Sequence, residues 1–86
     1  MDMQWFLKEV ASGKTGFRTS SNAIDDLATF QQLAEVALQA EALGYVGAVE
    51  TRKESFTGHR FYRVVVIHRG ITDTGREAIA KFSARF

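Results

Sequence analysis

Two histidines are the side chains in this chain best suited to acid–base or metal chemistry. His59 and His68 are nine residues apart, so on one regular strand they point to opposite faces and cannot share a metal ion. Acid–base catalysis needs a proton donor and a proton acceptor that converge on one pocket, and the other candidates are scattered carboxylates. We therefore predict no enzymatic activity, no metal site and no cofactor.

The letters GKT at residues 13–15 are those that end a phosphate-binding loop. That motif requires a glycine five positions earlier, where Lys8 stands, and a preceding strand, where the sequence predicts a helix. We interpret the segment as a turn. Phe17 is expected to be buried in a short extended piece, with Lys14 and Arg18 in solvent around it.

Basic and acidic residues are unevenly distributed along the chain. Between Thr19 and Thr51 there are five acidic residues and no Lys or Arg, whereas residues 52–86 contain eight basic and three acidic residues. The total net charge is only +1. Neutralisation of phosphates supplies most non-specific DNA affinity, so DNA contacts are expected in the basic part of the chain.

The basic residues cluster near the tip of a predicted hairpin, where they can contact a DNA backbone or minor groove. Charged side chains on a hairpin also discourage edge-to-edge pairing of strands, which explains the same residues without any ligand. The candidate DNA contacts of this hairpin are Arg52, Lys53, His59, Arg60 and Arg63.

Length and composition indicate one globular domain over residues 1–86. The chain is 45% hydrophobic and 24% charged, which is typical of a soluble protein. It has no cysteine, which excludes disulfides and thiolate metal sites and is consistent with a reducing compartment. No apolar run reaches the ~18 residues of a membrane span. We predict a cytoplasmic protein with no membrane partner.

A helix is predicted near the N-terminus, capped by Asp2 and ended by Gly13. Its apolar residues recur at helical spacing and form one face. Trp5 lies off this face, so its ring either packs against a neighbouring element or forms a self-association surface. The apolar face comprises Met3, Phe6, Leu7, Val10 and Ala11.

Residues 22–43 are helical in pattern, and Gly44 follows as a left-handed cap. Asn22, Asp25 and Asp26 suit a first turn. Thr29 and Gln32 have the spacing of a capping box, so the segment is either one helix or two. The core-facing stripe is Phe30, Leu33, Ala34, Ala37, Ala40 and Leu43, widened by Val36 and Leu38.

Residues 45–55 and 60–69 form two extended runs, joined by the hairpin loop FTGH. In the second run, alternation places Phe61, Val65 and Ile67 on one face. Tyr62, Val64 and Val66 fall on the other face.

A last helix follows the hairpin. Thr72 is a good cap residue, and Thr74 with Glu77 offers an alternative capping box. Gly75 allows close approach of this helix to the preceding strand. Ala78, Ile79 and Phe82 are expected to face inward.

Two segments of the sequence are similar to small bacterial winged-helix transcription regulators. In LQAEALGYV, residues 38–46, the helix ends in a Leu, Gly, apolar pattern before the first strand of the wing. GITDTGREAI, residues 70–79, resembles the [LI]-T-x-x-G-R-E step that follows the wing. The resemblance covers residues 30–82, although any strand-to-helix corner could use the same residues. It implies a small α+β fold, with helices followed by a two-stranded wing and a C-terminal helix.

The resemblance also implies a homodimeric DNA-binding regulator. Such proteins place a helix in the major groove, and the weaker candidates at the helix start here are Thr29, Gln31 and Gln32. The chain departs from the family because the region before Phe30 is short and polar, and because the would-be reading helix is acidic. Two hypotheses follow: double-stranded DNA bound mainly through the wing, or a protein-interaction module in which acidic helix and basic wing meet.

Overall fold

The computed structural model describes residues 2–83, which form three helices and one three-stranded antiparallel sheet. Arg85, one of the basic residues of the C-terminal half, lies outside this range. In chain order the elements are α1 (Met3–Ala11), β1 (Gly16–Arg18), α2 (Ile24–Ala42), β2 (Val49–Phe56), β3 (His59–Ile67) and α3 (Asp73–Ser83). These elements confirm the predicted α+β class, the hairpin and the C-terminal helix.

Helix α1 begins and ends as the sequence predicts. The Asp2 carboxylate accepts a hydrogen bond from the backbone N–H of Trp5 at 2.8 Å, which satisfies one of the free donors of the first turn. Gly13 follows the helix with a φ of 105°, a conformation that favours glycine. The helix buries Phe6, Leu7 and Val10, so its apolar face is part of the core.

Helix α2 is one continuous helix of 19 residues. The capping box predicted at Thr29 does not form, and the two-helix alternative is wrong. The helix starts after Ala23, and Asp25 and Asp26 occupy its first turn. Leu43, predicted on the core stripe, is the C-terminal cap of the helix and is 50% exposed, so the prediction that it faces the core is wrong.

Strand β3 is the middle strand of the sheet, in the order β1-β3-β2. Phe17 of β1 and Thr51 of β2 both pair with Val65. Phe56 and His59 close the hairpin around the two-residue loop Thr57–Gly58. Both loop residues have positive φ, as a type I′ turn requires. The short extended piece predicted at Phe17 is therefore a third strand.

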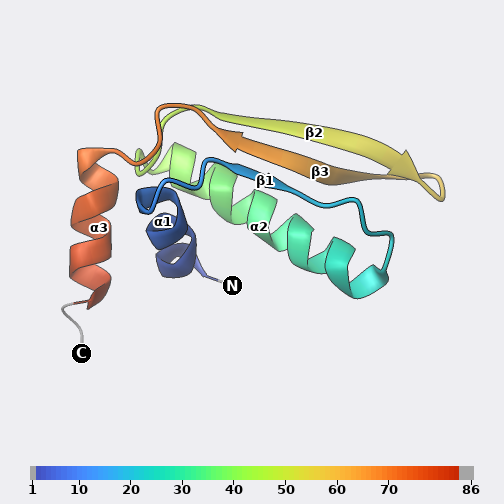
Figure 1. The fold of residues 1–86 in the computed structure, drawn as a ribbon, viewed down its shortest axis with the longest axis horizontal. Coiled ribbons are helices and arrows are strands. Elements are labelled where there is room, and N and C mark those ends of the chain that lie inside the picture. The colour runs from blue at the N-terminus through green and yellow to red at the C-terminus, as the bar shows by residue number, and fades with distance from the viewer. Residues whose placement is uncertain (1, 84–86) are drawn as a thin grey trace.

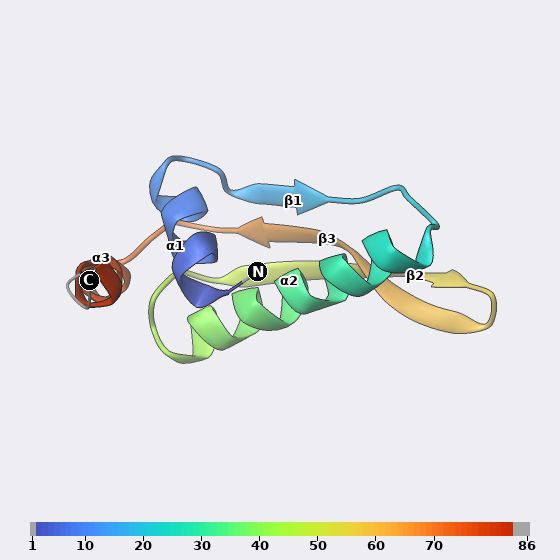
Figure 2. The ribbon, with the colours of Figure 1, turned by 90° about the horizontal axis from the view of Figure 1, so that it is seen from below.

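The helices α1 and α2 pack against one face of the sheet, and α3 lies beyond its end, beside α1 (Figures 1 and 2). In Figure 1 the sheet is the upper layer and α2 runs beneath it. Three alanines of α2, Ala34, Ala37 and Ala40, are fully buried and allow the helix to lie close to the strands. Among residues 2–83, no helix covers the other face of the sheet (Figure 1).

The corner between β3 and α3 is built by Thr72 and Gly75. The Thr72 hydroxyl accepts a hydrogen bond from the Gly75 N–H at 3.0 Å and donates one to the Gly44 carbonyl at 2.6 Å. Thr72 is therefore the cap, and the alternative capping box at Thr74 is wrong. Ala78 is buried, and Ile79 and Phe82 pack against the core, as predicted.

Candidate nucleic-acid interface

A β-bulge in β3 shapes the candidate site. Arg52 pairs with Val64 and the next residue of β2, Lys53, pairs with Tyr62, so Arg63 has no partner on β2. Gln31 of α2 satisfies the backbone there: its side-chain amide accepts from the Tyr62 N–H at 2.8 Å and donates to the Tyr62 carbonyl at 3.1 Å. The bulge is thus held by a side chain from the helix below.

Arg63 is buried, with only 6% of its surface exposed. Its guanidinium donates to the Ser21 carbonyl and to Oδ1 of Asn22, both at 2.6 Å. Arg63 therefore joins the hairpin to the segment between β1 and α2. Gln31 and the two terminal nitrogens of Arg63, both candidate DNA contacts from the sequence, are thus engaged in internal hydrogen bonds, and the remaining Arg63 Nε is buried. Asn22, expected in the first turn of α2, binds Arg63 instead.

Replacing Gln31 with alanine is expected to lower the free energy of unfolding by about 2 kcal/mol, because two half-buried backbone groups of Tyr62 lose their partner. Denaturant unfolding measures the change. Gln32→Ala is the matched control, since Gln32 is the exposed neighbour on the same helix, and we expect a change within about 0.5 kcal/mol. Equal stability of the two variants would contradict this role of Gln31.

On the uncovered face of the sheet, two exposed arginines lie on either side of Val64. Arg18 on β1 and Arg52 on β2 both pair with Val64 of β3. Since neighbouring residues of a strand point to opposite faces, and Phe17 and Val65 are buried toward the helices, this row faces away from α2. Arg18 was expected only as a solvated residue. Its place beside Arg52 depends on the pairing of β1 with β3, which the sequence does not reveal.

A cavity of about 360 Å³ opens beside these arginines. Arg18, Arg52 and Arg63 line it together with Glu54, and the segment after β1 contributes Thr19, Ser20 and Asn22. The cavity therefore contains three cationic side chains and one anionic side chain.

The other candidate residues of the hairpin are exposed. The Lys53 ammonium lies 4.5 Å from the centre of the Tyr62 ring, and the His59 ring lies 6.2 Å from that of Phe61, near the loop. Arg60, which follows His59 in β3, is also exposed. In Figure 1 the loop end of the hairpin projects beyond the start of α2. Lys53, His59 and Arg60 are thus accessible to a large partner.

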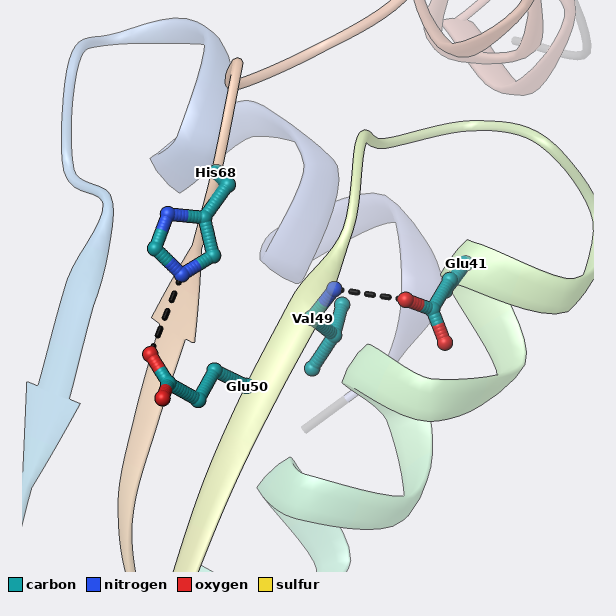
Figure 3. Close-up of polar contacts among 4 residues, drawn as sticks. All are labelled: Glu41, Val49, Glu50 and His68. Carbon is teal, nitrogen blue, oxygen red and sulfur yellow. Dashed lines mark hydrogen bonds and ion pairs between the residues drawn. The ribbon is translucent and has the colours of Figure 1, made fainter.

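Two acidic residues near the start of the hairpin already have partners (Figure 3). Oε2 of Glu50 lies 3.1 Å from Nε2 of His68, so the two side chains form an ion pair when the imidazole is protonated. Glu41 of α2 accepts a hydrogen bond from the Val49 N–H at 2.6 Å. Glu41 thereby occupies the first N–H of β2. Glu50 also lines a second, smaller cavity with Arg18 and Arg52, so both hairpin acids, Glu50 and Glu54, lie near these arginines.

Charge is separated between the two layers of the fold. Helix α2 contains four acidic residues and no Lys or Arg, a net charge of −4. The three strands contain five basic and two acidic residues, a net charge of +3. Thr29 and Gln32 are exposed on α2, but Asp25 and Asp26 lie in the first turn of the same helix. A polyanion is therefore attracted to the strands and repelled by α2.

Trp5 of α1 is 38% exposed. It lines a cavity of about 310 Å³ with Phe17, Phe30 and Leu33, and Lys14 and Arg18 also line this cavity. Both interpretations of this residue, packing and self-association, are compatible with a side chain that contacts its neighbours and still presents ring surface.

The two histidines are at opposite ends of β3, about 30 Å apart along the strand. The bulge at Arg63 breaks the regular alternation of β3, so strand periodicity does not decide which faces they point to. Their separation alone keeps them from sharing a metal ion. Within residues 2–83, no three His, Asp or Glu side chains are grouped as metal ligands would be. None of the helices in this range is long and apolar enough to span a membrane.

Comparisons with known proteins give no match: no family model, curated protein or solved structure is similar to the chain. The function of this chain is therefore inferred from its own residues and their arrangement.

Proposed function

We propose that this protein is a small winged-helix DNA-binding protein, with the regulatory role that the sequence resemblance implies. It contacts double-stranded DNA through the hairpin and the adjacent strand β1. The order of helices, hairpin and closing helix supports the winged-helix assignment. The observation that carries the proposal is the charge separation: the sheet has a net charge of +3 and α2 a net charge of −4.

The hairpin contacts the phosphate backbone or the minor groove, not the major groove through a helix. The sheet-facing side of α2 is buried and its outer side is acidic, so insertion of α2 into a groove would bring carboxylates close to phosphates. The exposed Lys and Arg residues of the three strands are Arg18, Arg52, Lys53 and Arg60, and none of them forms an ion pair among residues 2–83. Each remains free to replace a counterion on DNA.

Binding of wild-type protein to a short random duplex is expected to weaken steeply with salt. With four exposed cations on phosphates, the plot of log K against log salt should have a slope of about −3 to −4. Fluorescence anisotropy at a series of salt concentrations measures it. No binding at low salt would refute the proposal.

A protein-interaction module is the second candidate, favoured by two exposed features. Ile24 at the start of α2 is 83% exposed, and the opposite charges of α2 and the sheet allow one copy to bind another. In a twofold dimer, the acidic helix of each copy would meet the basic strands of its partner. Absence of duplex binding together with a dimer that dissociates at high salt, measured by sedimentation, would favour this function over DNA binding.

A further inference from the structure

Arg63 is a buried cation without an anionic partner. Its two hydrogen bonds go to neutral acceptors, the Ser21 carbonyl and the Asn22 amide oxygen, and its buried Nε has no partner among residues 2–83. The Phe56 ring, whose centre is 6.0 Å from the guanidinium carbon, gives only partial compensation. Buried charges in proteins are normally paired, because removing a charge from water costs several kcal/mol. A negative charge close to Arg63 would be strongly favoured.

The cavity beside Arg63 provides a place for that negative charge. Arg18 and Arg52 flank Val64 on neighbouring strands, which places their backbones about 10 Å apart with β3 between them. At this spacing, the guanidinium groups of Arg18 and Arg52 can both contact one tetrahedral anion that lies between them. Thr19 and Ser20 also line the cavity of about 360 Å³, and hydroxyl groups of this kind can donate to an anion.

The net charge of the cavity is positive. Glu54 is the one carboxylate that lines it, against three arginines, and no ion pair joins Glu54 to any of them. Arginine binds phosphate oxygens with two parallel hydrogen bonds, which makes it suited to this ligand. The site therefore combines shape, donors and an unbalanced charge of +2.

We infer that this cavity binds a single phosphate group, held directly by Arg18 and Arg52, with Arg63 beneath them as a fixed positive charge. The inference rests on the proposed function for the source of the ligand, a backbone phosphate of DNA. A phosphate-bearing small molecule offers the same chemistry and is the alternative source. The hydroxyls of Thr19 and Ser20 complete the donor set in either case.

The site is tested by titrating the full chain with inorganic phosphate while amide chemical shifts are recorded by NMR. Saturable shifts are expected around residues 18–22, 52 and 63, with a Kd on the order of 1 mM for two charge-assisted contacts. Arg18→Gln and Arg52→Gln should each weaken binding by about tenfold. Arg76→Gln is the matched control, since Arg76 is an exposed arginine on α3 that does not line the cavity, and it should leave the Kd unchanged.

Glu54→Gln provides a test of opposite sign. Removal of the one carboxylate should tighten phosphate binding by roughly two- to fivefold. Because this side chain is exposed and makes no ion pair, the variant is expected to fold normally. Phosphate that binds no more tightly to Glu54→Gln, or equally well to Arg52→Gln, would overturn the site.

Competition with a duplex separates the two sources. If inorganic phosphate binds and displaces DNA in proportion to occupancy, the ligand is a backbone phosphate. If phosphate binds but no duplex does, the site stands with a small-molecule ligand and the proposed DNA function fails. If a duplex binds, inorganic phosphate gives no saturable shift and Arg18→Gln has no effect, the phosphate site is wrong and the DNA proposal survives.

Discussion

Replacing Gly75 with alanine is expected to lower the free energy of unfolding by about 3 kcal/mol. An added Cβ would lie 2.1 Å from the Tyr45 carbonyl oxygen and 2.8 Å from Cγ1 of Ile71. The Tyr45 carbonyl also accepts the Thr72 N–H at 3.0 Å, so it cannot retreat without loss of that hydrogen bond. For a domain of this size, thermal unfolding should show a melting temperature lower by about 12–24 °C.

Gly16→Ala is the control for this prediction. A Cβ at Gly16 would have no heavy atom within 4 Å, and its φ is not in the left-handed region. We expect its stability to stay within about 0.5 kcal/mol of wild type. If Gly75→Ala were as stable as Gly16→Ala, the close approach of α3 to the Tyr45 carbonyl would not exist in solution.

Charge reversal of the hairpin is expected to weaken DNA binding strongly. Changing Arg52, Lys53 and Arg60 to glutamate removes three phosphate contacts and adds three repulsive charges, so affinity for duplex DNA should fall at least about 100-fold at about 50 mM salt. All three residues are exposed, so the fold should be retained. Anisotropy titration of the triple variant measures the loss, and unfolding curves check the fold.

Charge reversal on α2 is the matched control. Asp25→Lys with Glu35→Lys changes two exposed acidic residues on the other layer. If DNA contacts the hairpin, these changes should not weaken binding, and general attraction should strengthen it slightly. A protein that loses affinity on reversal of α2 and keeps it on reversal of the hairpin would contradict the proposed orientation.

The sequence predicts most of the local structure of this protein because its caps and periodicities act over short distances. Asp2, Gly44 and Thr72 mark helix boundaries correctly, and the hairpin loop follows from its glycine. The capping box at Thr29 was wrong, because helix propensity on both sides favours continuing α2 over an internal cap. A capping-box sequence therefore does not start a new helix when the residues on both sides of it favour one continuous helix.

The candidate site is less predictable, because its arrangement depends on strand pairing and a bulge. The sequence identified Arg52, Lys53 and Arg60 as exposed hairpin cations, but it also grouped Arg63 with them. Arg63 lies at a register shift between β2 and β3, and its hydrogen bonds to the β1–α2 segment join residues 41 and 42 positions apart in sequence. Arg18 was overlooked for the same reason, since only the pairing of β1 with β3 brings it beside Arg52.

An amide NMR titration with a short DNA duplex tests the central claim most directly. The proposed binding surface predicts the largest shift changes at Arg18 and in the hairpin from Arg52 to Arg63, with small changes along the outer side of α2 from Asp25 to Gln39. Shift changes concentrated on α2, or none in the hairpin at saturating duplex, would contradict binding through the hairpin.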